Sequence, residues 1–246
     1  MTRLDRPTAT PMSSSFLRFF IAAAVAAACS RPGAAVEKTS TASAAGTTVT
    51  PSTTPTVTTT GAVPHDSISD RADRGRILGD SAAPIWVIMA SDFQCPYCKQ
   101  WEDANYAKVV KDYVKTGRVR LAFLNMPLSM HRNALPASEA AMCASVQNKF
   151  WQLHDTLFAS QAAWEVLPDP RPKLDSIAKA KGVDMPQWRA CMAQHATLAL
   201  IDADRDRARQ AGVNSTPTFF VGNQTLAGAD ANVSAAIDAA LKAKPK

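Results

Sequence analysis

The sequence predicts an α/β fold in which helices cover both faces of a single sheet. Three observations support this prediction. A β-α-β pattern begins near Ile77, a helix-prone stretch covers about residues 133–211, and a β-β-α pattern closes the chain. Packing helices on both faces of one hydrophobic sheet buries all of these elements. We therefore expect a helical block to be inserted between the two strand-containing parts of the chain.

The β-α-β pattern consists of two strands and one long helix. The apolar run Ile85–Ala90 predicts a buried strand, and the alternation in Val119–Leu124 predicts a second one. A helical pattern occupies about residues 96–116 between them, and Gly117 is expected to end that helix. We expect ordered structure to begin near Ile77.

The remaining elements follow from helical periodicity and from short apolar runs. Helices are predicted over about residues 134–147, 149–161, 173–181 and 185–211, the last with an interruption. Strands are predicted at residues 218–221 and 225–227, and a terminal amphipathic helix at residues 233–243.

Residues 1–28 are predicted to be a signal peptide. Arginines precede a short apolar stretch that ends in small residues, and this stretch is too short to span a bilayer. Two processing routes are open. Signal cleavage at the A-x-A site of Ala26–Ala28 is one, and lipidation of Cys29 is the other, because residues 25–30 resemble the lipobox of bacterial lipoproteins.

Residues 29–66 are rich in Thr, Ser, Pro and Ala and have no apolar periodicity. Such a segment buries too little apolar surface to offset the entropy lost on ordering. We therefore expect a disordered tether. A coil of this length holds the folded domain, expected at residues 67–246, roughly 30 Å from its anchor.

The chain contains five cysteines, which leaves one unpaired in an exported protein. Lipidation of Cys29 leaves four, enough for two pairs in an oxidising compartment. We predict that Cys143 and Cys191 form a structural disulfide in the helical block. Two buried free thiols are the alternative.

Cys95 and Cys98 form a Cys-x-x-Cys motif that directly follows a predicted strand and opens a helix. The unpaired amides and the positive end of the helix dipole favour a thiolate at Cys95, so this residue is the expected nucleophile. Cys98, one turn further, is the expected resolving thiol. Pro96 loses no hydrogen bond at the first helical position.

The alternative for this motif is half of a zinc site, which needs two further ligands at suitable spacing. Cys143 and Cys191 are isolated, and the four histidines form no paired ligand pattern. We therefore expect no metal and no other cofactor. His131 and His154 are expected to be ordinary helix or cap residues.

Three runs of the chain resemble the DsbA-like thioredoxin-fold oxidoreductases of bacterial envelopes. They are Ser91–Gln100 with the two cysteines, Asn148–Asp155, and Gly212–Val221. The resemblance implies a thioredoxin fold with an inserted helical domain at about residues 130–211. It also implies that Pro217 is a cis proline facing the thiol pair, with Thr216 beside it. A proline lacks an N–H and takes the cis form readily.

Two further positions qualify the expected mechanism. Glu102 lies four residues after Cys98, so its carboxylate is expected to face the resolving thiol and relay its proton. A solvated acid on the helix surface is the alternative. Met89 stands six residues before Cys95, where thioredoxins often have a buried acid, so the reductase mechanism does not transfer simply.

The sequence thus predicts an enzyme that donates its Cys95–Cys98 disulfide to reduced exported client proteins and is reoxidised by a membrane partner. The expected location is the periplasmic side of the bacterial envelope, lipid-anchored or soluble. A disulfide isomerase or reductase, and a noncatalytic binding module, are the alternatives. The net charge of +6, without a basic run, gives no reason to expect nucleic acid as a partner.

If Cys29 carries a lipid, the mature protein stays with membranes and Cys29→Ser releases it into the soluble fraction. The measurement is membrane fractionation together with the intact mass of the mature protein. An unmodified mature N-terminus in the intact mass would contradict the expectation.

Overall fold

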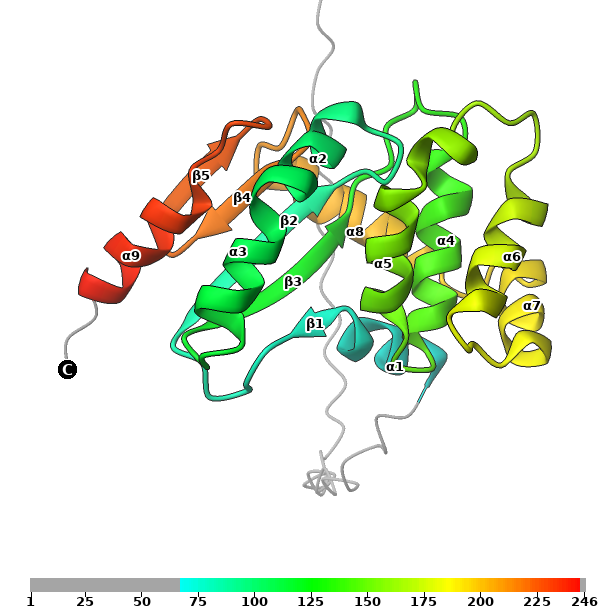
Figure 1. The fold of residues 1–246 in the computed structure, drawn as a ribbon, viewed down its shortest axis with the longest axis horizontal. Helices are drawn as coiled ribbons and strands as arrows, with labels where there is room; N and C mark the ends of the chain where they lie inside the picture. Colours follow the sequence, from blue (N-terminus) through cyan, green and yellow to red (C-terminus); the bar gives the residue numbers. More distant parts are fainter. Residues whose placement is uncertain (1–66, 244–246) are drawn as a thin grey trace, which may run out of the picture. The chain divides into compact units, whose positions relative to one another are not determined.

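The computed structural model describes residues 67–243. The expected signal peptide and tether, and Cys29 with them, lie outside the described residues. Within residues 67–243 the strands form a five-stranded sheet in the order β1-β3-β2-β4-β5 (Figure 1). The strands are β1 (Ile77–Leu78), β2 (Ile85–Ser91), β3 (Val119–Asn125), β4 (Thr218–Val221) and β5 (Gln224–Ala227). The fold is the expected α/β arrangement with a helical insertion.

Strands β2 and β3 form the parallel centre of the sheet, and the other pairs are antiparallel. In β3 the residues alternate between buried and half-buried, as the sequence pattern predicted. Strand β2 is more uniformly apolar: Val87 and Met89 are fully buried on one face, and on the other face Trp86 is exposed whereas Ala90, near the motif, is fully buried. Its last residue, Ser91, therefore brings the chain to the Cys-x-x-Cys motif from the middle of the sheet.

The helical rod after the motif is not one regular α-helix. It consists of α2 (Pro96–Trp101), a π-helical segment (Glu102–Tyr106), α3 (Ala107–Val109) and a second π-helical segment (Val110–Val114). Gly117, at a φ of +71°, follows the end of the rod. Trp101 fixes the rod to the sheet, because its indole N–H donates to the carbonyl of Ala231 at 3.2 Å and its ring contacts Phe219 of β4.

The helical insertion lies between β3 and β4. It contains α4 (Ala134–Ser145), α5 (Phe150–Ala159), a 3-10 turn (Gln161–Ala163), α6 (Arg171–Ala180), α7 (Met185–Ala193) and α8 (Leu198–Gln210). Figure 1 shows α2 and α3 in front of the sheet and α8 behind it, with α4 to α7 grouped at one side. Helix α4 is buried almost throughout and packs against α1, α5, α6 and α7. The last helix, α9 (Val233–Ala243), packs against β2 and β4.

Ordered structure begins earlier than expected from the sequence, with helix α1 (Ile68–Gly75) before β1. Ser67 and Asp70 form a capping box, in which each side chain accepts from the other residue's backbone N–H. Gly75 lies so close to Ser145 of α4 that a Cβ atom would clash with its carbonyl oxygen. The sequence pattern did not reveal α1 because the helix is polar overall. Its buried residue is Ala72, and it packs against α4.

A buried ion pair connects the end of α1 to α8. The guanidinium of Arg76 pairs with Asp204 of α8 and donates to the carbonyl of Phe123 at 3.1 Å. Asp204 also accepts from the backbone N–H and the side-chain amide of Asn125. Burial lowers the pKa of Arg76, but the Asp204 and Asp73 carboxylates outweigh this effect and raise it. Both charges are therefore compensated inside the protein.

No helix within residues 67–243 combines the length and the apolar character that crossing a bilayer requires.

Cys143 of α4 and Cys191 of α7, 48 positions apart in the sequence, form a disulfide with their Cα atoms 5.8 Å apart. Replacing both with serine should lower the free energy of unfolding by about 4 kcal/mol, because the unfolded chain regains the entropy of an open loop. Denaturant unfolding of the double variant measures this loss. An unchanged stability would show that the bridge does not contribute. Alkylation of both cysteines in the unfolded, unreduced wild-type chain would show that no bridge forms.

Candidate active site

Cys95 and Cys98 lie at the start of α2, directly after the central strand β2. Cys95 is the N-cap residue and Pro96 takes the first helical position. The backbone N–H of Cys95 donates to the carbonyl of Asp92 at 3.1 Å, and its carbonyl accepts from Lys99 at 3.1 Å. Both thiols are free in this structure, and Cys95 is the more accessible, with 3% of its surface exposed against 0% for Cys98.

The pKa of the Cys95 thiol is lowered to about 6, mainly because the Cys98 thiol donates a hydrogen bond to the Cys95 thiolate. Burial opposes this shift. The neighbouring Thr216 and the backbone N–H groups of Cys98 and Tyr97 add to it. The helix N-terminus thus contributes as the sequence suggested, but the larger contribution comes from the second cysteine. A pKa of about 6 favours the thiolate form of Cys95 at neutral pH, which is the form that the expected role as nucleophile requires.

The pKa of Cys98 moves in the opposite direction. Burial raises it well above its ordinary value, and the neighbouring Cys95 thiolate raises it further. The Ser91 hydroxyl and the backbone N–H of Asp92, 3.5 Å from the Cys98 sulfur, partly offset this effect. Cys98 therefore keeps its proton and donates it to the hydrogen bond.

The Thr216–Pro217 peptide bond is cis and lies against the thiol pair. The Thr216 carbonyl oxygen lies 3.5 Å from the Cys95 sulfur and accepts a hydrogen bond from it only when Cys95 is protonated; Thr216 is itself buried. The Pro217 carbonyl accepts from the backbone N–H of Gly228 at 2.9 Å, which fixes the loop next to β5. The two residues assigned from the resemblance thus lie where it placed them.

Asp92 organises the loop between β2 and the motif. Its fully buried carboxylate accepts from the backbone N–H groups of Gln94, at 2.7 Å, and Leu128, at 2.9 Å. The second of its oxygens also lies 2.7 Å from Nδ1 of His131. Since the N–H of Asp92 points at the Cys98 sulfur, these contacts hold a donor in place beside the resolving thiol.

The helical insertion supplies further contacts to the same loop. The buried side-chain amide of Gln161 donates to the carbonyls of Phe93, at 2.7 Å, and Cys95, at 3.2 Å. The side-chain amide of Gln94 donates to the carbonyl of Glu165, and its oxygen accepts from the backbone N–H of Asn133 at 2.7 Å. The motif is therefore positioned by the insertion as well as by the sheet.

Glu102 is buried and is not a solvated surface acid. Its carboxylate lies 3.3 Å from Nε2 of His154 on α5, so it pairs with the insertion rather than with Cys98. Burial alone would lower the pKa of His154, but the Glu102 and Asp155 carboxylates raise it to about 9. Aromatic rings surround His154, among them Phe93 next to the motif. The proton-relay role of Glu102 stays a prediction.

Sequence reasoning missed Asp92, His131 and Gln161. The sequence did give a weak signal for Asp92. This acid directly follows a predicted buried strand and precedes Cys95 by three residues, and a buried acid usually has a partner. Its partner His131 lies 39 positions away, and the spacing of neither residue reveals the contact. Within residues 67–243 no three His, Cys, Asp or Glu side chains group closely enough to hold a metal ion.

Comparison with known proteins places this geometry in context. The profile of a thioredoxin family matches residues 71–239. The probable disulfide bond formation protein D of Bacillus anthracis is 28% identical over 195 residues, which cover 74% of this chain and 89% of that protein. The Na(+)/H(+) antiporter NhaA 3 of Salinispora tropica is 36% identical over 151 residues. That match covers 61% of this chain, which spans only about a fifth (22%) of the antiporter's length.

Two solved structures share the fold. BdbD from Bacillus subtilis, in its oxidised form, superposes with a TM-score of 0.62 at 24% identity, covering 69% of this chain and 94% of that one. The α-DsbA1 protein of Wolbachia pipientis superposes with a TM-score of 0.60 at 22% identity, covering 68% and 90%. At these identities the likeness shows the fold, including the helical insertion.

Asp92→Ala should lower the free energy of unfolding of the dithiol form by about 3–5 kcal/mol, because it leaves buried donors without their acceptor. The matched control is Asp103→Ala, which removes an exposed acid from the neighbouring helical turn and should change stability by less than about 0.5 kcal/mol. Denaturant unfolding of both variants measures the difference. Equal losses in the two variants would contradict the role assigned to Asp92.

Proposed function

This chain belongs to the thioredoxin family, and from that membership and its Cys95–Cys98 pair we propose that it is a thiol–disulfide oxidoreductase that donates a disulfide to client proteins. The observation that carries the proposal is the asymmetry of the pair. Cys95 has a lowered pKa at the start of α2, and Cys98 behind it keeps its proton. A nucleophilic thiolate beside a protonated partner is the arrangement that disulfide exchange needs.

The reaction proceeds through a mixed disulfide. A client thiolate attacks the Cys95 sulfur of the oxidised protein, the Cys95–Cys98 bond breaks, and Cys98 leaves as a thiolate that takes up a proton. A second client thiolate then attacks the client sulfur of the mixed disulfide, and Cys95 leaves as a thiolate. Two electrons pass from the client to the protein, so the client gains a disulfide and the protein becomes a dithiol.

The direction of transfer follows from the stability of the dithiol form. Stabilising the Cys95 thiolate stabilises the reduced protein, and a more stable reduced form makes the disulfide a stronger oxidant. Met89 adds to this tendency, since no carboxylate stands beside the thiols at that position. We infer that the protein acts as a net oxidant of its clients rather than as a reductase or isomerase.

The stability that the lowered pKa of Cys95 gives to the reduced protein depends on pH. Because the pKa of Cys95 falls from its ordinary value of 9.0 to about 6, its contribution to the stability of the reduced protein is fully present above about pH 9. It is lost progressively as the pH falls from there through about 6. The disulfide is therefore a stronger electron acceptor, relative to an ordinary thiol pair, at neutral than at acidic pH.

The partners follow from the same proposal. Clients are exported proteins with reduced cysteines, and a membrane oxidant restores the Cys95–Cys98 disulfide after each cycle. Support for an extracytoplasmic setting comes from the Cys143–Cys191 disulfide and from the leader-like residues 1–28. Lipidation of Cys29 would keep the domain on its tether at the membrane surface.

The oxidised full chain should convert a reduced, unfolded client to its disulfide form while gaining two thiols itself. With a client that already carries a disulfide, Cys98→Ala should accumulate mixed disulfides on Cys95, because the Cys95 thiolate attacks the client disulfide, releases one client thiolate, and has no Cys98 thiol to resolve the product. Cys95→Ala should accumulate almost none. Mass spectrometry after acid quenching measures both species.

Equal trapping by the two variants would mean that the roles of Cys95 and Cys98 are reversed. An oxidised protein that leaves an excess of client thiols unchanged would refute disulfide donation. Acceleration only of the rearrangement of wrongly paired client disulfides would favour the isomerase.

A further inference from the structure

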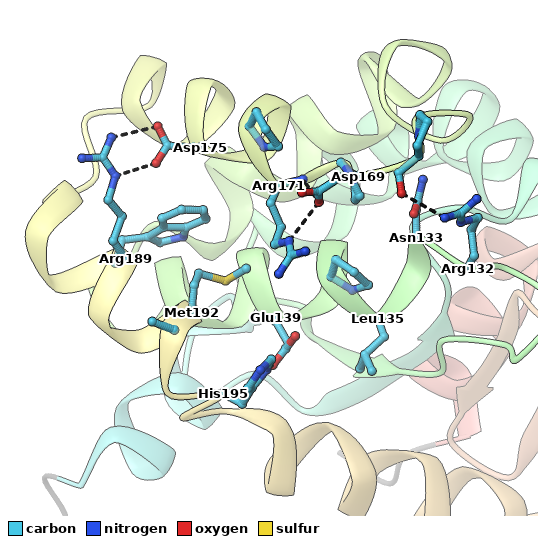
Figure 2. Close-up of a pocket in the computed structure, with 16 residues that line it drawn as sticks. Arg132, Asn133, Leu135, Glu139, Asp169, Arg171, Asp175, Arg189, Met192 and His195 are labelled. Carbon is cyan, nitrogen blue, oxygen red and sulfur yellow. Dashed lines mark hydrogen bonds and ion pairs between the residues drawn. The ribbon is translucent and has the colours of Figure 1, made fainter.

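The helical insertion contains a cavity of about 870 Å³ between the start of α4, the segment leading into α6, and α7 (Figure 2). Its apolar walls include Leu135 of α4 and Trp188 and Met192 of α7. Prolines form much of the rest, at positions 136, 168, 170 and 172. Proline has a fixed φ, so these walls are largely rigid and need little ordering when a ligand enters.

The charged side chains around the cavity are nearly all paired with one another. Arg171 donates to Asp169 at 2.9 Å, and Arg189 holds Asp175 through two hydrogen bonds (Figure 2). The remaining arginine in the lining, Arg132, donates to the carbonyl of Pro168. These contacts leave one carboxylate in the lining, that of Glu139, without an arginine or lysine partner among the described residues.

Glu139 is on α4, and its side chain is only 6% exposed. Within residues 67–243 its one hydrogen-bond partner is Nδ1 of His195, 2.7 Å from Oε1. Arg171 does not take this place: its pKa is raised mainly by Asp169 and only slightly by Glu139. A buried carboxylate with a single partner retains acceptor capacity for a further donor.

His195 is held in an unusual backbone conformation to make this contact. Its φ is +49°, and it stands directly after the α7 cap where the Ala196 N–H bonds back to the Cys191 carbonyl, a position that usually favours glycine. A side chain other than glycine is strained in this left-handed conformation. Figure 2 shows His195 and Glu139 together on one side of the cavity, with Arg171 and Asp169 across from them.

The cavity is connected to the active site by a short series of contacts. Gln94, next to Cys95, bonds to the backbone of Asn133 and Glu165, and Asn133 itself lines the cavity. Two strongly exposed apolar side chains lie on the same loops, Met130 at 80% and Val166 at 77% exposed. Met130 lies three residues before Asn133, and Val166 directly follows Glu165, so both are exposed on the loops that join the cavity to the motif.

We propose that this cavity binds the side chain of a lysine or arginine in the client polypeptide whose cysteine reacts with Cys95, with Glu139 accepting from the cationic group. The proposal rests on the disulfide-donor function and adds a preference among clients. The aliphatic stem of the client residue packs on Leu135 and Met192, and its charged end meets the one carboxylate that lacks a cationic partner. The cavity then acts as a second subsite, separate from the thiols.

The test uses the oxidised full chain and unstructured peptides that carry two neighbouring cysteines and one lysine. The lysine is moved from one to about ten residues away on either side, a span of roughly 33 Å when extended. At one range of spacings the peptide disulfide should form about tenfold faster than in peptides with uncharged norleucine at the same position, the effect of one charge-assisted hydrogen bond. This comparison needs no protein variant.

Glu139→Gln should abolish the advantage of lysine over norleucine, because it keeps the shape of the side chain and removes its charge. Asp202→Asn removes an equal charge from exposed α8 and should leave the advantage intact. Circular dichroism and thermal unfolding show that both variants are folded before the rates are compared.

Rates that do not depend on lysine spacing in the wild-type chain would overturn the inference. An advantage of lysine that survives Glu139→Gln would overturn it as well. In both of these cases the peptides are still oxidised. If the donor function itself fails, no peptide is oxidised at any spacing, and the inference fails with it.

Discussion

The hydrogen bond from the Cys98 thiol to the Cys95 thiolate is the interaction on which the rest of the site depends. It lowers the pKa of Cys95 more than any other group does, and it requires Cys98 to keep its proton in a buried place. The Cys98 thiol thus lowers the pKa of Cys95, whereas burial first, and the Cys95 thiolate after it, raise the pKa of Cys98. The surrounding structure has to exclude water from Cys98 while leaving Cys95 just accessible, and small displacements of either residue would weaken the bond.

Sheet and insertion share the task of holding the two sulfurs. Strand β2 delivers the motif from the centre of the sheet, and the Thr216–Pro217 loop closes it from β4. The insertion contributes Gln161 to the carbonyls of the motif, and the β3–α4 connection contributes His131 to Asp92. The buried Glu102–His154 contact joins the rod to α5 one turn below the thiols. The insertion is thus part of the active site.

Local sequence signals were sufficient for β2 to β5 and for the place of the Cys95–Cys98 motif at the start of a helix, but not for the two-residue strand β1. Strand β4 matches its expected bounds, since apolar runs with turn residues on both sides define such elements. Contacts between distant positions were not readable: Arg76 and Asp204 are 128 positions apart, and each alone looks like an exposed charge. Helix α1 was missed although its capping box is present in the sequence, because its eight residues are mostly polar and only Ile68 and Ala72 give it an apolar side. The π-helical segments of the rod also left no signal in the sequence pattern.

The most direct test of this account is the thiolate titration of Cys95, followed by ultraviolet absorbance across pH, in the reduced wild-type chain and in Cys98→Ala. The account predicts a wild-type midpoint at about 6 and a clear upward movement towards the ordinary thiol value of 9.0 in the variant, because the main donor to the thiolate is gone. A wild-type midpoint near the ordinary value would contradict it. So would the same low midpoint in both proteins, which would assign the stabilisation to the helix N-terminus and Thr216 alone.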